Sequence, residues 1–216
     1  MGEARARCVR RHPERGQYDS AVVRAILDEA LVCHLGVVIG GEPLVLPTIH
    51  ARVGDQLYVH GAVAAATLKA MAGSTVCVTV SLVDGLVLAR SAFNHSLNYR
   101  SVVVRGLGTV VESPEEKCVA LQALVEHVAA GRWADTRPPS AVELKITQVV
   151  RLSLADATAK VRTGPPNDDA GDMNWSGWAG VLPLTLTAGR PEPDARMANP
   201  SLPPPAYVQT YRRGPS

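Results

Sequence analysis

The stretch STVCVTVSLVDGLVLARSAFNHSLNYRSVVVRGLGTVVE (Ser74–Glu112) decides the fold class of this chain. From Val76 to Leu82, every second residue is apolar, and the residues between them are cysteine, threonine or serine. This alternation predicts an antiparallel strand with one buried face. The pair Asp84–Gly85 predicts a turn after it, and the valine-rich run from Arg100 to Glu112 predicts another long strand.

The same pattern continues on both sides of this stretch. Further strands are predicted at 33–39, 43–53, 56–61 and 146–155. Gly40–Gly41 and Gly54–Asp55 separate the first three of these and are typical turn sequences. Strands joined by so few residues form antiparallel sheets, which commonly close into small barrels that leave no exposed edge. A parallel, doubly wound sheet is not expected, because helices do not alternate with the strands.

Two helices flank the predicted strands. The first spans Asp19–Val32, whose apolar residues recur at helical spacing. The second has a clear start, because Ser113 can cap it, Pro114 takes the first helical position and Glu116 follows three residues after the cap. Its buried stripe is predicted to consist of Cys118, Leu121, Leu124, Val125 and Val128.

The composition indicates a globular chain without a strong charge bias. Hydrophobic residues make up 46% of its 216 residues and charged residues 19%, and the net charge is +2. Neither nucleic acid nor an acidic membrane surface is therefore favoured as a partner. No apolar run reaches the roughly 18 residues that span a bilayer. The four cysteines form no CxxC pair, so that no metal site is expected and a reduced, cytoplasmic setting fits best.

The chain is expected to have three parts. Residues 1–16 form a polar leader and residues 17–164 the β-rich domain. Residues 165–216 hold ten of the 16 prolines, and a sheet interior excludes proline because it lacks the N–H donor. We therefore expect an extended arm that packs partly on the barrel or on a dimer partner, where Trp175 and Trp178 can dock.

No common catalytic motif occurs in the chain. It has no GxSxG nucleophile elbow, no HExxH zinc motif and no P-loop. His50 and His60 stand at the ends of neighbouring predicted strands and would share one rim of a barrel, which is a natural ligand mouth. The alternative is that they are merely polar residues at a wet rim. His127 is expected on an exposed helix face, where its partial charge suits the helix C-terminus.

Two segments combine small or polar residues in an unusual way. In LYVHGAVAAATLKAMAG (Leu57–Gly73), the small residues allow either close packing or close approach of the backbone to a ligand. In NHSLNYRS (Asn94–Ser101), Arg100 can bind a phosphate or carboxylate and Tyr99 can stack on a planar ring. The alternative for the second segment is a polar loop held by an arginine–carboxylate pair.

Taken together, these stretches resemble a known family. The sequence from Leu57 to Ser113 resembles the pyridoxamine 5′-phosphate oxidase-like split barrels, within the branch of nitroimidazole-resistance (Nim-type) and flavin-nucleotide-binding proteins. The motifs LPTIHARVGDQLYVHG, NYRSVVVRG, AKVRTGPPNDD and WAGVLPL extend the resemblance over roughly Arg10 to Leu186. It implies a mainly β (α+β) fold, a six-stranded antiparallel split β-barrel, that forms a homodimer with FMN in two clefts at the subunit interface.

The resemblance also implies the site residues. The cofactor-binding candidates are His60, Gly61, Ala62, Thr67, Lys69, Asn98, Tyr99, Arg100, Ser101 and Val102. His60 matches a histidine that Nim-type proteins place in the active cleft. Ala62 and Ala65 stand where hydroxyl residues would help to hold a phosphate, so that Lys69, Thr67 and backbone amides would have to replace them.

The function expected on this basis is that of an FMN-binding oxidoreductase that reduces or oxidises a small organic substrate. A nicotinamide is the expected electron donor, and nitroaromatic reduction is one possible reaction. His60 would act as the proton donor or substrate anchor, with His50 and Trp178 as weaker substrate candidates. The alternatives are a non-catalytic protein that binds FMN, haem or deazaflavin on the same fold, and a flavin-free dimer.

Overall fold

The structure, a computed structural model, describes residues 8–199 and 201–213. The strands are β1 (Gly16–Gln17), β2 (Val32–Ile39), β3 (Glu42–Val53), β4 (Gln56–Ala62), β5 (Thr75–Leu88), β6 (Ser96–Leu107), β7 (Thr109–Val110), β8 (Thr147–Ser153), β9 (Ala157–Arg162) and β10 (Gly180–Pro183). The α-helices are α1 (Ser20–Glu29), α2 (Ala66–Met71), α3 (Pro114–Val128), α4 (Ala141–Ile146) and α5 (Ala206–Gln209). Over the described ranges, no helix is both long and apolar enough to cross a membrane.

The strands form one antiparallel sheet, which confirms the expected mainly β fold with flanking helices. Its order is β1-β9-β6-β5-β2-β3-β4-β8-β7, and β10 pairs with β5. The predicted count of six strands was too low, because four further strands, β1, β7, β9 and β10, join the sheet. The two ends of the path do not pair with each other. However, only Gly108 separates β6 from β7 in the chain. The sheet is therefore curved, so that β7, at one end of the strand order, lies next to the end of β6, an inner strand.

Two of the three predicted turns are confirmed. Gly40 and Gly41 have φ angles of 61° and 86° and link β2 to β3 in a register that pairs Ile39 with Glu42. Gly54, with φ 57°, links β3 to β4. These left-handed conformations favour glycine, because a side chain would clash with the backbone there. The local sequence was therefore sufficient to place both turns.

The third predicted turn, Asp84–Gly85, is wrong. β5 runs without interruption from Thr75 to Leu88, with a β-bulge between Val83 and Gly85. Gly85 is needed because β10 passes close by: a Cβ there would lie 3.0 Å from the Leu182 carbonyl oxygen. The predicted alternation is confirmed in the first half of β5, where Val76, Val78 and Val80 are buried.

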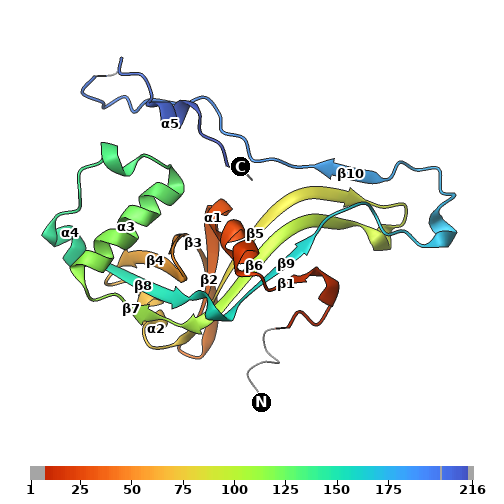
Figure 1. Cartoon of the computed structure of the whole chain (residues 1–216), viewed down its shortest axis with the longest axis horizontal. Helices are drawn as coiled ribbons and strands as arrows, with labels where there is room; N and C mark the ends of the chain where they lie inside the picture. The colour runs from red at the N-terminus through yellow and green to blue at the C-terminus, as the bar shows by residue number, and fades with distance from the viewer. Residues whose placement is uncertain (1–7, 200, 214–216) are drawn as a thin grey trace.

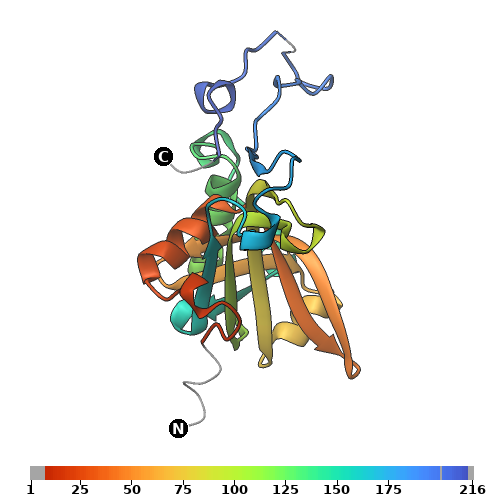
Figure 2. The same cartoon turned by 90° about the vertical axis from the view of Figure 1, so that its right-hand side faces the viewer.

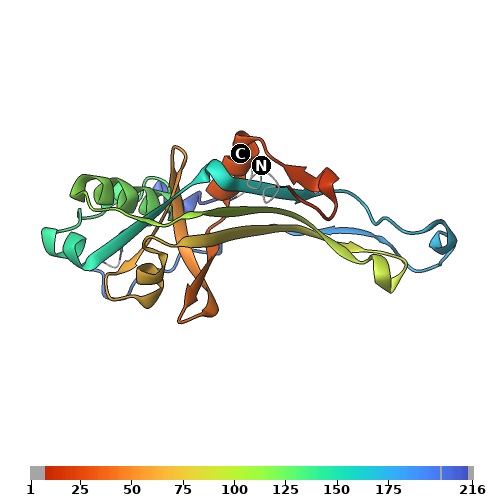
Figure 3. The same ribbon diagram turned by 90° about the horizontal axis from the view of Figure 1, so that it is seen from below.

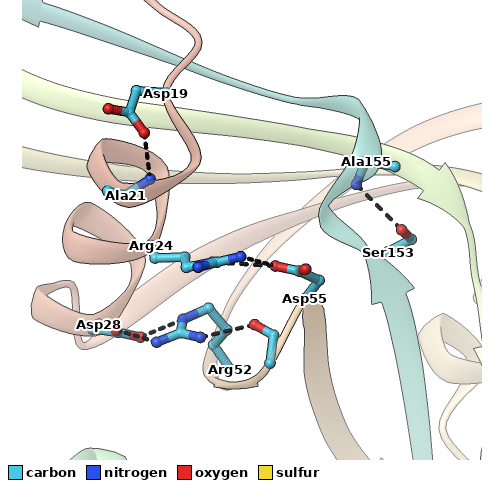
Figure 4. A network of polar contacts seen from close by, with 9 residues as sticks. Asp19, Ala21, Arg24, Asp28, Arg52, Asp55, Ser153 and Ala155 are labelled. Atoms are coloured by element: carbon cyan, nitrogen blue, oxygen red, sulfur yellow. Dashed lines mark hydrogen bonds and ion pairs between the residues drawn. The ribbon is translucent and has the colours of Figure 1, made fainter.

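The two predicted helices are also present. The Asp19 carboxylate caps α1 by accepting from the Ala21 amide at 2.8 Å, and Val23, Ile26 and Leu27 face the core. Ser113 caps α3 by accepting from the Glu116 amide at 3.2 Å. Ion pairs tie α1 to the β3–β4 hairpin (Figure 4). These pairs, Arg24–Asp55 and Arg52–Asp28, are partly exposed and contribute at most about 1 kcal/mol each.

The molecule is elongated, with α3 and α4 at one end and the connection from β9 to β10 at the other (Figures 1 and 3). After β10 the arm returns along the sheet to α5, near the end of α3 (Figures 1 and 2). Arg213 holds the returning arm by donating from Nε to the Glu29 carbonyl at 2.7 Å. In the single chain Trp175 and Trp178 are 69% and 70% exposed, so their docking on a dimer partner stays a prediction.

Candidate functional site

His60 lies on β4, where it pairs with Val149 of β8. Its side chain is half-buried, and its Nδ1 atom is fully buried without a hydrogen-bond partner in the described structure. Burial lowers the pKa of His60, because removal from water disfavours the charged imidazolium. The ring is therefore neutral at pH 7. A neutral imidazole is a metal ligand rather than a ready proton donor.

His60 opens into a cavity of about 490 Å³ beneath α3. The helix side of the cavity is formed by Leu121, Leu124, Val125 and Val128. These residues were predicted to be buried in the core as the apolar stripe of the helix. Of the four, only Leu124 is fully buried, and Val128 remains 39% exposed. The stripe is wider than the sheet can cover, and its remaining width lines the cavity.

The rim of the cavity carries two arginines. Arg137 is paired with Glu143, with Nη2 and Oε1 2.7 Å apart. Arg132 donates to the Tyr207 hydroxyl at 3.1 Å and has no carboxylate within ion-pair distance among the described residues. Tyr207 belongs to α5, so the arm does reach this cavity, although through a tyrosine rather than through Trp178.

This arrangement suits a large, flat, mostly apolar group that carries a metal and has acidic substituents. The apolar walls would hold the ring, the imidazole of His60 would supply a ligand, and Arg132 would face the acids. A haem has these properties, and its iron takes histidine as an axial ligand. No group of three or more His, Cys, Asp or Glu residues able to hold a bare metal ion occurs in the described ranges. A haem needs only one or two protein ligands.

His50 does not share this cavity, although it lies one strand away from His60. It is fully buried, its Nε2 lies 3.0 Å from the Leu27 carbonyl, and its ring centroid is 4.8 Å from that of His127. The prediction that His127 lies on an exposed face was wrong. The end of α3 packs on α1, so the ring of His127 is half-buried and its Nε2 lies 2.8 Å from the Ala30 carbonyl.

We expect His50 to make folding stability depend on pH. Burial first, and then repulsion by His127, lower the pKa of His50 to about 4, against about 6.5 in the unfolded chain. Arg213 lowers it further, while the Leu27 carbonyl and Asp28 oppose the shift. The unfolded state thus binds more protons between these values, so stability falls as the pH is lowered. The contribution of His50 to this loss is about 2 kcal/mol from pH 7 to pH 5.

The measurement is urea unfolding at both pH values, compared with the His50→Gln variant. Glutamine keeps a donor for the Leu27 carbonyl but does not titrate in this range. Between pH 7 and pH 5, the free energy of unfolding of the variant should fall by about 2 kcal/mol less than that of the wild type. Equal losses in the two proteins would show that His50 does not carry this dependence.

The small-residue segment after His60 packs first against the protein itself. A Cβ on Gly61 would lie 2.9 Å from Cδ1 of Leu68 in α2, so the close approach at Gly61 involves a neighbouring helix. Ala62 and Lys69 are exposed, and Thr67 is partly exposed. A cofactor role for this segment stays a prediction, and Lys69 is accessible for it.

The NYRSV segment lies in β6 rather than in a loop. Asn98 and Val102 are buried, whereas Tyr99 and Ser101 are partly exposed. The Arg100 guanidinium is held by two carboxylates, with Nη2 2.7 Å from Asp84 Oδ1 and 2.8 Å from Glu29 Oε1. The hydrogen bonds that Arg100 donates to the carboxylates of Asp84 and Glu29 raise its pKa above the ordinary value. This is the arginine–carboxylate arrangement of the alternative interpretation, and binding of a cofactor by Arg100 stays a prediction.

One chain does not bring the two predicted cofactor segments together. Lys69 lies on α2, next to the C-terminal end of β6, where the Gly73 amide donates to the Gly108 carbonyl at 2.9 Å. Tyr99 lies near the opposite end of this twelve-residue strand. At about 3.3 Å per residue, nine residues of strand separate the two ends by roughly 30 Å. Trp178 also lies outside the cavity of His60.

Sequence reasoning missed the arginines at the cavity rim. Arg132 and Trp133 follow the glycine that ends the second predicted helix, and nothing in the local pattern marks them as functional. The apolar stripe of this helix gave no signal either, because five apolar positions over eleven residues are ordinary for a helix that packs on a core.

Comparison with known proteins adds a family and structural relatives. Residues 19–161 match the family model described as pyridoxamine 5′-phosphate oxidase. No curated protein sequence matches the chain. Among solved structures, the flavocytochrome Anf3 of Azotobacter vinelandii is 40% identical with a TM-score of 0.90, and the match covers 97% of each chain.

Two further solved structures are informative. The FAD and haem binding protein of Mycobacterium smegmatis is 32% identical with a TM-score of 0.85, over 90% of this chain and 96% of that one. A candidate 5-nitroimidazole antibiotic resistance protein of Bacteroides thetaiotaomicron is 25% identical with a TM-score of 0.57. That match covers 68% of this chain and 86% of the other.

Proposed function

The chain belongs to the pyridoxamine 5′-phosphate oxidase family, and from this premise we propose that it is a redox protein that holds a flavin and a haem. The observation that carries the proposal is the apolar cavity beneath α3, which is lined by the half-buried His60, whose Nδ1 atom has no hydrogen-bond partner among the described residues. Two relatives that match this chain over nine tenths or more of its length are a flavocytochrome and an FAD and haem binding protein.

In this proposal, each part of the cavity has a separate task. When bound, a flavin supplies two-electron chemistry and a haem one-electron chemistry. His60 ligates the haem iron and stays neutral because its surroundings exclude water. The leucines and valines of α3 keep the ring out of solvent, and Arg132 pairs with an acidic substituent at the rim. Tyr207 orients Arg132 through the hydrogen bond between them.

The flavin is proposed to lie between two copies of the chain. Lys69 of one copy and Tyr99 of the other would line one cleft, because a single chain holds them at opposite ends of β6. Exposed apolar side chains support such a contact: Leu44, Val45 and Leu46, which alternate between the two faces of β3, are 38% to 62% exposed. Soluble monomers rarely leave contiguous apolar residues in water.

A second candidate is an FMN-dependent reductase of small organic compounds, including nitroaromatics, without haem. The likeness to the nitroimidazole-resistance candidate of Bacteroides thetaiotaomicron favours it. In that case His60 would contact the substrate instead of a haem. Deazaflavin is an alternative to flavin in either reading, since its phosphate end requires similar cations.

The visible spectrum of the purified protein, together with its mass by light scattering, tests the proposal. We expect a Soret band together with flavin bands, a mass of two chains, and bleaching of the flavin by a nicotinamide dinucleotide under anaerobic conditions. Flavin bands without a Soret band, also after addition of haemin, would overturn the haem assignment in favour of the reductase. The mass of a single chain would overturn the shared cleft.

A further inference from the structure

A second pocket, of about 540 Å³, lies away from α3. It is formed where a short 3-10 helix at Pro13–Arg15 and another at Ala92–Asn94 meet β6 and β9. Its lining includes four permanent cations, Arg11, Arg15, Lys160 and Arg162, and no acidic residue. The positive charge of the chain, small as a whole, is thus concentrated in one concave site.

Arg162 is a buried cation without an anion. Only 8% of the residue is exposed, and its guanidinium donates to neutral groups: the Asn98 side-chain oxygen, the Gly164 carbonyl at 3.3 Å and the Pro165 carbonyl at 3.1 Å. No carboxylate lies within ion-pair distance of it in residues 8–199 and 201–213. Burial and the nearby charge of Arg15 lower the pKa of Arg162. A buried charge of this kind is costly unless an anion meets it.

Other groups around the pocket also lack partners. The Nδ2 atom of Asn94 is buried without a hydrogen bond in the described structure. Arg11 and Lys160 form no ion pair within the described ranges, and Arg15 has only a 3.6 Å contact with the exposed Glu14. Each of these groups is a donor, so the lining offers several donors and no anion, while the exposed Glu14 contacts Arg15 and His12 from outside it.

The pocket also has aromatic side chains. Tyr99 lines it from β6, and Phe93, the single phenylalanine of the chain, is 92% exposed at its edge. An exposed phenylalanine has no role in packing, but it can stack on a planar heterocycle. The pocket therefore combines sites for phosphate with a surface for a base.

We propose that this pocket binds the phosphate groups of a nucleotide, with Arg162 as the buried anchor and Phe93 beside the base. Four cations and no acidic residue in the lining favour the multiply charged phosphates of a nucleotide over a single carboxylate. The volume of about 540 Å³ falls in the range of small-molecule sites and excludes a polymer. The adenosine diphosphate part occurs in two dinucleotides, one that carries a flavin and one that carries a nicotinamide. Of these two ligands, only the flavin dinucleotide rests on the proposed function.

The test compares four full-length proteins: wild type, Arg162→Gln, the double variant Arg15→Gln/Lys160→Gln, and the control Arg190→Gln/Arg196→Gln. The control removes the same charge from the exposed arm as the double variant removes from the pocket. For each protein we would measure the identity and amount of flavin per chain, the haem per chain, and the Kd of ADP-ribose by titration calorimetry. Arg15 and Lys160 are partly exposed, so the double variant folds even if Arg162→Gln does not.

Two results would support the proposal and identify the source. A fall of at least about tenfold in bound FAD, at unchanged haem, would assign the pocket to the resident flavin. Unchanged flavin with an ADP-ribose Kd at least about tenfold higher would assign it to the nicotinamide donor. The proposal is overturned if the double variant retains as much FAD as the control and binds ADP-ribose with the same Kd. It is also overturned if the wild type holds no FAD and binds no ADP-ribose. Neither readout needs a haem, so a missing Soret band would leave the result interpretable.

Discussion

His60→Ala should purify without haem. The apolar cavity beneath α3 offers many contacts to a flat ring, but His60 is the side chain in its lining that would ligate iron. Loss of a residue that only orients a metal ligand weakens metal binding about 10- to 100-fold, so loss of the ligand itself should weaken it at least about 100-fold. The measurement is the ratio of Soret absorbance to protein absorbance, supported by the haem content per chain.

The control for this variant is His34→Ala. His34 is exposed on β2 and lies outside the cavity, so its removal should leave the Soret band unchanged. Added imidazole should restore part of the Soret band in His60→Ala, because it can occupy the space of the lost ring, and a purely structural role of His60 would give no such rescue. A Soret band of full intensity in His60→Ala would contradict the assignment.

Gly108→Ala should destabilise the fold strongly. Gly108 lies between β6 and β7, where its amide donates to the Ser74 carbonyl at 2.9 Å and its carbonyl accepts from the Gly73 amide at 2.9 Å. A Cβ at this position would lie 2.3 Å from the Met71 carbonyl oxygen and 3.0 Å from its carbonyl carbon. Both are backbone atoms held by α2, so the methyl group must push the helix and the strand apart.

The expected loss in free energy of unfolding is about 3 kcal/mol or more, at the upper end of overpacking effects. For a chain of this size, it corresponds to a fall in Tm of about 6 to 12 °C. Gly61→Ala should cost less, about 1 kcal/mol, because its Cβ would meet only the end of the flexible Leu68 side chain. Gly171→Ala has open space and should stay within about 0.5 kcal/mol of wild type. If thermal unfolding gives Gly108→Ala the same Tm as Gly171→Ala, the predicted clash of the Gly108 methyl group with the Met71 backbone is wrong.

Much of the secondary structure was predictable because short-range contacts decide it. The alternation around Val78, the glycine turn at Gly40–Gly41 and the cap at Ser113 each depend on residues within a few positions of one another. The error at Asp84–Gly85 has a long-range cause. Its glycine is required by β10, almost a hundred residues later in the sequence, rather than by a turn.

The candidate site was only partly predictable for the same reason. His60 was identified from its place at a strand end, but the wall that it faces comes from α3, about sixty residues further along the chain. The segment around Arg100 had the composition of a phosphate site, yet the Arg100 guanidinium is paired with the carboxylates of Glu29 and Asp84. Arg162 had no distinctive local signal, and only the fold shows that it is buried without a carboxylate.

By itself, the sequence determined the antiparallel strands, both flanking helices and the family, because periodicity, caps and ordered motifs are properties of neighbouring residues. The tertiary structure alone decided which polar groups are already paired and which are left without a partner. Arg100 is neutralised by acids that the chain brings from a distance, whereas within the described residues the buried Nδ1 atom of His60 and the buried Arg162 have no such partner. Pairing depends on residues that meet only after packing, and burial sets the energetic cost of leaving a group unpaired.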